Sequence, residues 1–299
     1  MCRLEAEQSS ANVRVWPVFA LVPAAMLGAA LLTGAVVTVA ALATTGEVDE
    51  DELLAFARTP LGVSLVIVPS QMVFLAAALC AALVSPLGAR RRLALGAPRI
   101  PLAACALLVL GTLGVQGIIQ LLSPLLGEPS ENLVELANML GTGTGTGAVF
   151  VTVLASVLPG LCEELFFRGY AQTRLVLRFG APLAILFCSA LFALAHFDPQ
   201  HVVAVFPLGV WLGVIAWLAG SIWPAVIAHA LNNAFAVIVL RLSADPADPT
   251  NIGAPPGAWS YALFAAALLA GVAGILLARL ALRRPPVPQV GADATAPPG

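Results

Sequence analysis

The chain has 299 residues, of which 60% are hydrophobic and only 10% are charged, and its mean hydropathy is +0.96. A soluble domain of this length needs many more charged residues to cover its surface, so the composition excludes an ordinary soluble protein. The formal net charge is −2, and all fourteen basic residues are arginines. The only arginine run, Arg90 to Arg92, lies between two apolar blocks, which is typical of a membrane anchor. We therefore expect no nucleic-acid partner.

Apolar blocks follow one another along the chain, most of them close to the roughly 20 residues that a helix needs to cross hydrocarbon. A single span can satisfy its own backbone hydrogen bonds only as a helix. The sequence therefore predicts an all-α polytopic membrane protein with about eight transmembrane helices. In chain order the blocks are approximately Val15–Ala43, Leu61–Val84, Pro101–Leu126, Ala148–Phe167, Pro182–Phe197, Val202–Leu218, Trp223–Leu240 and Trp259–Ala281.

The arginines are sorted between the loops on the two sides of this arrangement. If the N-terminus is cytoplasmic, only Arg58 and Arg241 face the opposite side, together with the acidic segments 47–52 and 128–135. This is a strong positive-inside bias. We expect a multi-pass protein of the plasma (inner) membrane, surrounded by the lipid bilayer, with both termini in the cytoplasm. The arginines placed on the cytoplasmic side are Arg3, Arg14, Arg90, Arg91, Arg92, Arg99, Arg168, Arg174, Arg178, Arg279, Arg283 and Arg284.

Composition divides the chain into three parts. Residues 1–147 hold the first three helices, residues 148–242 hold helices four to seven, and residues 243–299 hold an outer loop, the last helix and a tail. The GTGTGTG run at Gly141–Gly147 is interpreted as a spacer, because it lacks the lysine of a phosphate-binding loop. The Pro- and Asp-rich segment 243–257 predicts an outer loop. The Pro- and Ala-rich tail from Pro285 is expected to be disordered.

Ionisable residues inside apolar helices are costly and therefore mark candidate functional sites. The fourth block contains Glu163, Glu164 and Arg168, and the fifth ends in Phe192 and His196. The seventh block contains His229 and Asn233, so two of the three histidines belong to this set. The sequence predicts a polar cavity formed by helices four to seven.

Helical spacing gives the two glutamates different roles. Glu164 and Arg168 are four residues apart, so they share a helix face and can pair. Glu163 is rotated from Glu164 by about 100° and remains free to act. His229 and Asn233 also share a face. If helix four ended at Arg168, Glu163 would lie too near the cytoplasmic surface to meet His196, so we expect this helix to continue toward Arg174 or Arg178.

A carboxylate and an imidazole that meet in a low-dielectric pocket can activate water. Glu163 would take the proton of the water, and His196 would hydrogen-bond the same water or share the proton. Attack on a peptide carbonyl creates an oxyanion that needs preorganised donors. His229 and the Asn233 amide could supply them, so the residue types suit hydrolysis of a peptide bond in a peptide or membrane protein.

These three elements resemble the CPBP family of CAAX proteases and bacteriocin-processing (Abi) proteins, which includes the type II CAAX prenyl endopeptidases. The elements are EExxxR (Glu163, Glu164, Arg168), FxxxH (Phe192, His196) and HxxxN (His229, Asn233), in this order between Ala148 and Leu240. The resemblance implies an intramembrane endopeptidase. It makes Glu163 the catalytic glutamate, His196 its partner, and His229 with Asn233 the stabilising pair, while Glu164 and Arg168 organise the site.

Several alternatives remain open. A zinc ion would have to be held by Glu163, His196 and His229 across three helices; without an HExxH motif we favour a metal-free glutamate mechanism with no cofactor. The chain could instead be a non-catalytic membrane scaffold or bacteriocin-immunity-type protein that retains the site. A small transporter that uses the same polar residues as a relay is a further alternative, although no repeated halves support it.

Overall fold

The computed structural model describes residues 14–46, 49–85, 88–141, 143–243 and 258–283. Within these ranges the regular structure is entirely helical, which confirms the predicted all-α class. The predicted outer loop, apart from its first residue, and the predicted disordered tail lie outside the described residues, as do Arg3 and Arg284. The helices are α2 (Trp16–Thr45), α3 (Glu50–Ala57), α4 (Pro60–Leu83), α5 (Ala89–Arg92), α6 (Leu102–Leu122), η1 (Ser123–Leu126), α7 (Glu131–Gly141), α8 (Gly145–Glu164), η2 (Leu165–Gln172), α9 (Thr173–Phe179), α10 (Ala181–Leu194), α11 (Pro199–Ala219), α12 (Trp223–Ser243) and α13 (Ala258–Arg283).

All eight predicted apolar blocks form helices in the described chain. Seven helical segments are long and apolar enough to cross a membrane. The eighth block is the shorter helix α10, which has 14 residues and a length of about 21 Å at 1.5 Å per residue. The result is a polytopic membrane protein in which α10 spans less of the hydrocarbon than its neighbours.

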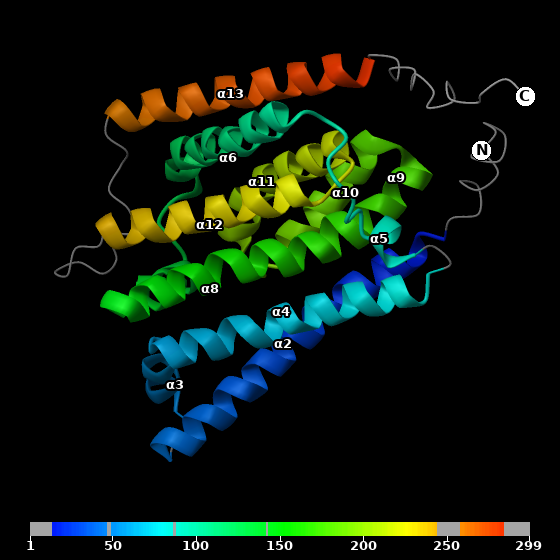
Figure 1. Ribbon diagram of the computed structural model, residues 1–299. Helices are drawn as coiled ribbons and strands as arrows, with labels where there is room; N and C mark the ends of the chain where they lie inside the picture. Colours follow the sequence, from blue (N-terminus) through cyan, green and yellow to red (C-terminus); the bar gives the residue numbers. More distant parts are fainter. Residues whose placement is uncertain (1–13, 47–48, 86–87, 142, 244–257, 284–299) are drawn as a thin grey trace, which may run out of the picture.

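The long helices lie roughly side by side and form a row across the molecule (Figure 1). α2 packs on α4, α4 on α8, α8 on α12, α12 on α6, and α6 on α13. Helices α10 and α11 pack on each other behind this row, and α11 also contacts α6 and α12. The fold therefore encloses α8 and α12, the two helices that carry most of the predicted polar residues.

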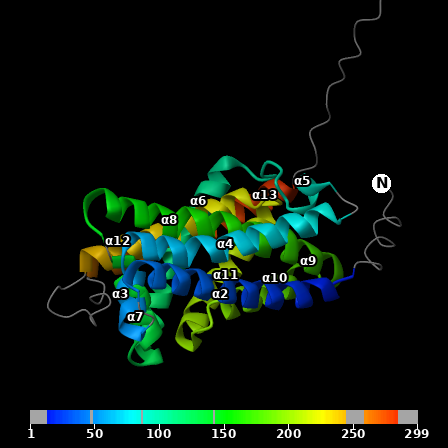
Figure 2. The same cartoon turned by 90° about the horizontal axis from the view of Figure 1, so that it is seen from below.

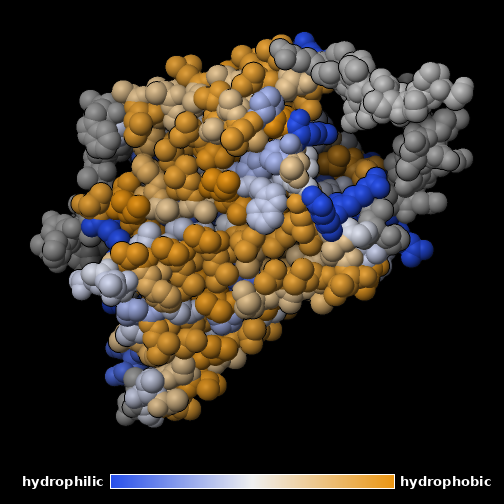
Figure 3. Space-filling model, in the orientation of Figure 1, coloured by the Kyte–Doolittle hydropathy of each residue, from blue (hydrophilic) through white to orange (hydrophobic). Residues whose placement is uncertain are grey.

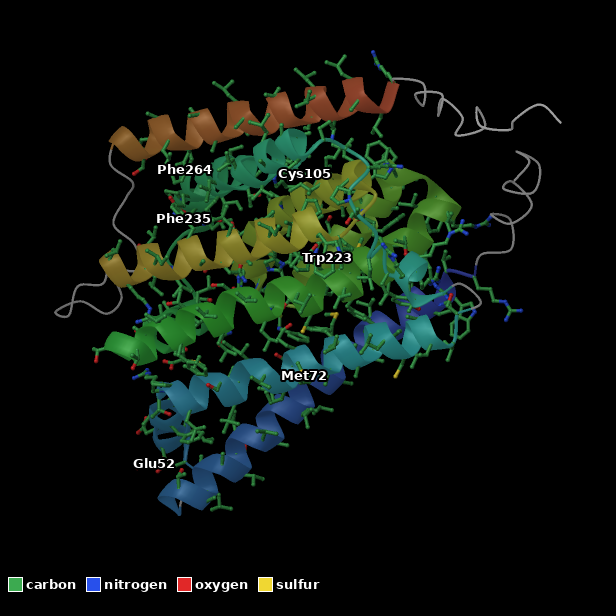
Figure 4. The ribbon with its side chains drawn as sticks, in the orientation of Figure 1. Glu52, Met72, Cys105, Trp223, Phe235 and Phe264 are labelled. Atoms are coloured by element: carbon green, nitrogen blue, oxygen red, sulfur yellow. The ribbon has the colours of Figure 1, made fainter. Side chains whose placement is uncertain are left out.

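Glycines bring α6 and α13 into close contact. A Cβ atom added to Gly111 would lie 2.6 Å from the Cα atom of Gly271, and one added to Gly114 would lie 2.5 Å from the backbone nitrogen of Leu268. Small residues allow membrane helices to approach in this way and to gain dispersion contacts that lipid cannot supply. Phe264 lies on this same face of α13, where a Cβ atom added to Gly117 of α6 would lie 2.3 Å from its ring. Its ring also meets that of Phe235 edge to face at 6.2 Å and connects α13 to α12 (Figure 4).

The fourth predicted span is longer than its apolar block. Helices α8, η2 and α9 run without interruption from Gly145 to Phe179, over 35 residues. This confirms that the helix continues past Arg168, and it corrects the predicted end at Phe167. It also corrects the assignment of Arg168 to the cytoplasmic arginines, because only 1% of this residue is exposed. The middle segment, Leu165–Gln172, is a π-helix, a form that often occurs at functional sites.

The two ends of the bundle differ in charge and structure. α2 begins and α13 ends at the same end, where the arginines of α5, α9 and α13 also lie (Figure 1). The short helices α3 and α7 lie at the opposite end (Figure 2). There Arg58 is paired with Glu135 of α7. Between the ends, the surface in Figure 3 is largely hydrophobic, as expected for contact with lipid.

Candidate active site

The continuous helix from Gly145 to Phe179 determines how deep Glu163, the first predicted site residue, lies in the helix bundle. Glu163 precedes the helix end at Phe179 by 16 residues, about 24 Å along the axis. His196 lies 15 residues after α10 begins at Ala181. Because the two helices meet at Gly180, both residues lie at a similar depth in the bundle.

Glu164 and Arg168 form the fully buried ion pair that their spacing predicts. Nη1 of Arg168 donates to Oε1 of Glu164 at 2.6 Å, and both side chains are 0% exposed. The guanidinium also stacks over the Phe192 ring at 4.3 Å from its centroid. A buried pair of this kind is costly to break, because removal of one partner leaves an uncompensated charge.

The predicted histidine of α12 is attached to this pair. Nδ1 of His229 lies 3.0 Å from the same Oε1 atom of Glu164. An ionised carboxylate only accepts hydrogen bonds, so Nδ1 is the protonated nitrogen in this contact. As with histidines in other hydrolytic and metal sites, the carboxylate fixes the tautomer and the orientation of the ring. It leaves Nε2 pointing toward the second glutamate.

Glu163 is the carboxylate that stays outside the ion pair. Its Oε2 atom lies 4.0 Å from Nε2 of His229, a distance too long for a direct hydrogen bond. Its Oε1 atom accepts a hydrogen bond of 2.9 Å from Nε2 of Gln71, a buried residue of α4. The structure therefore separates the two adjacent glutamates as their rotation predicts, one bound to Arg168 and the other facing an imidazole.

Phe192 joins the second predicted histidine to the cluster. The ring of Phe192 meets His229 at a centroid distance of 5.6 Å and His196 at 5.4 Å, both nearly edge to face. Nδ1 of His196 lies 3.2 Å from the backbone oxygen of Phe192. The His196 ring also contacts the ring of His201, and their centroids are 4.5 Å apart. His196 is thus connected to the cluster by its contact with the Phe192 ring.

Asn233 lies on the same helix face as His229 but is attached to the backbone of α8. Its Nδ2 atom donates to the carbonyl oxygen of Ala155 at 3.3 Å, and its Oδ1 atom accepts from Asn232 at 3.4 Å. An amide nitrogen carries two hydrogens, so one donor remains for another acceptor. This arrangement links α12 to α8 at Ala155, about two helical turns before Glu163.

The polar cluster is anchored to α11 by two successive turns of the π-helical segment. Nη2 of Arg168 donates to the carbonyl oxygen of Gly209 at 2.9 Å, and Nε2 of Gln172 donates to that of Gly213 at 2.9 Å. A Cβ atom at Gly213 would lie 2.8 Å from Oε1 of Gln172. Glycine at this position therefore allows the side chain to reach the carbonyl.

Polar contacts also hold the segment that follows His196. The Ser130 hydroxyl donates to Asp198 at 2.7 Å, and the Asp198 side chain accepts from the backbone nitrogen of His201 at 2.9 Å. The hydrogen bond from Ser130, followed by that from His201, lowers the pKa of the Asp198 carboxyl. These hydrogen bonds connect the start of α7 to the segment between His196 and His201.

Sequence reasoning missed two glutamines of this site. Gln71 and Gln172 lie in helices with few other polar residues, and both are buried. A buried amide in an apolar span is itself a signal of an interhelical partner. The prediction concentrated on ionisable groups and therefore passed over them.

Among the described residues, no group of three or more His, Cys, Asp and Glu side chains is placed to hold a metal ion. The candidate zinc ligands Glu163, His196 and His229 do not form such a group in the described part of the chain.

The comparisons with known proteins agree with the position of this cluster. Residues 145–235 match the family model described as Rce1-like, type II CAAX prenyl endopeptidase. No curated protein and no solved structure matches the chain. The matched segment contains Glu163, Glu164, Arg168, His196, His229 and Asn233. The predicted resemblance is therefore confirmed, and residues 145–235 are similar to the Rce1-like type II CAAX prenyl endopeptidases.

Proposed function

We propose that this protein is an intramembrane endopeptidase that hydrolyses a peptide bond in a membrane-associated protein or peptide. The observation that carries the proposal is the arrangement of Glu163 beside His229, with the ring of His229 oriented by Glu164. A scaffold gains nothing from a second buried carboxylate without a cationic partner, and such a group is expensive inside a membrane. A role as the base that activates water in hydrolysis accounts for that carboxylate.

In the proposed reaction, one water lies beside the line that joins Oε2 of Glu163 and Nε2 of His229, which are 4.0 Å apart, and contacts both atoms. Glu163 takes one proton from this water while the oxygen attacks the peptide carbonyl carbon. Breakage of the C–N bond then transfers the proton from Glu163 to the leaving nitrogen. The products are a carboxylic acid and an amine, and the glutamate is regenerated as a carboxylate.

The developing oxyanion would be stabilised by donors on one face of α12. The second amide hydrogen of Asn233 is one candidate, since the first is used by Ala155. The ring of His229 is the other, because Glu164 holds it in a fixed orientation. His196, whose ring packs on Phe192, is proposed to assist the attacking water.

The Rce1-like match supports peptidase chemistry for residues 145–235. The matched family is described as prenyl endopeptidases, whereas the substrate proposed for this chain is not a prenylated one. The arginine-sorted loops suit a bacterial inner membrane, where a prenylated C-terminal cysteine is not an obvious substrate. We propose a peptide or membrane-protein substrate that reaches the cluster within the bilayer.

The proposal is tested by comparing membranes that contain the wild-type protein with membranes that contain Glu163→Gln, and by mapping new protein termini. Glu131→Gln is the matched control, because it makes the same change at an exposed position of α7. We expect termini that depend on Glu163 and are unaffected by Glu131→Gln. Purified protein should then cleave the peptides so identified. Identical termini with all three proteins would contradict the endopeptidase and favour the scaffold.

A further inference from the structure

A second cluster of polar groups lies at the end of the bundle where α2 begins, between that helix, α5 and α9 (Figure 1). Its centre is the buried ring of Tyr170 in the π-helical segment. The guanidinium carbon of Arg92, the last residue of α5, lies 5.8 Å from the centroid of this ring, and that of Arg174 in α9 lies 5.2 Å from it. Both distances are within the range of a cation–π contact. One aromatic ring thus brings two positive charges together.

Arg92 is almost enclosed but has no negative partner in the described part of the chain. Only 5% of it is exposed, and no ion pair or side-chain hydrogen bond joins it to another described residue. Its Nε atom is closed off, whereas its two Nη nitrogens are open, as is the hydroxyl of Tyr170, which also lacks a partner among these residues. A buried charge without a partner is destabilising. The open donors therefore indicate an acceptor that comes from outside the described chain.

Arg174 is fixed beside the same ring by the start of α2. Its Nη1 atom donates to the backbone oxygen of Arg14 at 3.2 Å, two residues before that helix begins. It forms no ion pair with another described residue either. A guanidinium has five donor hydrogens, so this one bond orients the group and leaves other donors for a ligand.

The described carboxylates lie away from this cluster. Glu163 and Glu164 belong to the candidate active site, and the others lie in or beside α3 and α7, or at Asp198, which is bonded to Ser130 at the start of α7. In the described chain, no group at the cluster can neutralise the arginines or pair with the ammonium of a zwitterionic ligand. The cluster thus suits an anion that carries no cation of its own.

Two tryptophans place the cluster at the level of lipid headgroups. Trp16 is exposed, begins α2 and follows Arg14 by two residues. Trp223 is exposed, begins α12 and donates from its indole nitrogen to the backbone oxygen of Leu95, three residues after Arg92. Tryptophan is enriched where the membrane meets water. The anion most available at that depth is the phosphate of a lipid.

We propose that Arg92, Arg174 and Tyr170 form a binding site for the phosphate of an anionic phospholipid. Guanidinium groups bind phosphate oxygens through paired, charge-assisted hydrogen bonds, and the tyrosine hydroxyl adds a neutral donor. Phosphatidylglycerol brings one uncompensated negative charge, whereas phosphatidylcholine also brings a fixed positive charge that the cluster cannot pair. Free phosphate offers the same oxygens and is the alternative source of the ligand. The site does not depend on the proposed peptidase activity.

Thermal unfolding of the full-length protein with added lipid tests the site. A ligand that binds only the folded protein raises Tm as its concentration rises. Purified, delipidated protein in uncharged detergent is given phosphatidylglycerol, phosphatidylcholine with the same acyl chains, or inorganic phosphate. The variants are Arg92→Gln, Arg92→Lys and Tyr170→Phe. Arg283→Gln is the matched control, because it removes one positive charge from an exposed position on the last turn of α13, which packs on α6 and α11.

We expect phosphatidylglycerol to raise the Tm of the wild type and of Arg283→Gln alike, at concentrations where phosphatidylcholine has no effect. Arg92→Gln should need at least about tenfold more phosphatidylglycerol for half of the shift, because it loses a charge-assisted hydrogen bond. Arg92→Lys should need an intermediate amount, since it keeps the charge but not the planar fork. Tyr170→Phe keeps the ring and loses the hydroxyl, so it carries the test if Arg92→Gln does not fold. Native mass spectra should show one retained phosphatidylglycerol on the wild type and none on Arg92→Gln.

Several outcomes would overturn the site. An equal shift with both lipids, or an equal loss of the shift in Arg92→Gln and Arg283→Gln, would show only a general attraction to the surface. Stabilisation by inorganic phosphate with none by phosphatidylglycerol would overturn the lipid as the source. Residues 1–13, outside the described chain, include Glu5 and Glu7. If Glu5→Gln with Glu7→Gln lowered the Tm in lipid-free detergent as much as Arg92→Gln does, and all three changes together had no further effect, one of these carboxylates would be the partner of Arg92.

Discussion

His229 is oriented by Glu164 and not by Glu163. Its Nδ1 atom lies 3.0 Å from Oε1 of Glu164, while its Nε2 atom lies 4.0 Å from Oε2 of Glu163. The same Oε1 atom accepts a hydrogen bond from Arg168. Adjacent glutamates in one helix therefore have separable tasks, one structural and one proposed as chemical, and substitutions should separate them.

Glu163→Gln should abolish cleavage and leave the fold intact, whereas Glu164→Gln should lower the thermal stability of the protein. The first change keeps a side chain that can bond to Gln71 but removes the base, a loss of about 10²–10⁴ in kcat. The second leaves the guanidinium of Arg168 buried without its counter-charge, at a cost of about 3–5 kcal/mol. Thermal unfolding in detergent and a cleavage assay measure the two effects.

The reverse pattern would contradict this division of roles. If Glu164→Gln melted like the wild type while Glu163→Gln melted much lower, Glu163 would be the structural residue. Glu131→Gln again controls for the removal of one negative charge, since Glu131 is exposed at the start of α7.

Gln71→Leu should lower kcat about tenfold to a hundredfold with little effect on KM. Its Nε2 atom donates to Oε1 of Glu163, and a hydrogen bond to a charged group contributes about 1.5–3 kcal/mol. Without it the carboxylate loses the contact that fixes its rotamer. Gln120→Leu, on the half-buried side of α6, is the control. Equal activity of Gln71→Leu and the wild type would exclude Gln71 from the site.

Much of the fold was predictable because lipid imposes simple rules on sequence. Each apolar block had to become a helix, and every predicted block did. The contacts of Glu164 with Arg168 followed from helical spacing alone. The length of the fourth span followed from the requirement that Glu163 and His196 lie at the same depth.

The remaining features depend on packing between helices, which one-dimensional spacing does not contain. Gln71 is 92 residues from Glu163 in the sequence, and nothing in α4 indicates which helix its amide will meet. The attachment of His229 to Glu164 likewise requires the relative rotation of α8 and α12. The edge-to-face contact of Phe192 with two imidazoles depends on where the short helix α10 ends.

His196→Asn should reduce kcat by at least about a hundredfold if His196 assists the attacking water. His201→Asn should reduce it less, because His201 contacts the ring of His196 and acts through it. The two variants are compared by cleavage of one peptide at saturating concentration. Full activity of His196→Asn would restrict the proposed mechanism to Glu163 and His229.

Ser130→Ala should destabilise the protein at neutral pH and have progressively less effect in acid. The hydrogen bond from Ser130 lowers the pKa of Asp198 in the folded state, so ionised Asp198 stabilises the fold. A depressed folded pKa contributes stability that is fully present above the unfolded value, about 3.9, and is lost as the pH falls through the folded value.

The measurement is the difference in Tm between wild type and Ser130→Ala across a pH series. The difference should be constant from about pH 7 to 5 and shrink below about pH 4, as the carboxyl that accepts the hydrogen bond becomes protonated. Ser123→Ala is the matched control, because the Ser123 hydroxyl donates to a backbone oxygen of the preceding turn and faces no titrating group through that bond. A difference that grows in acid would reverse the sign and show that Ser130 does not favour the charged form of Asp198.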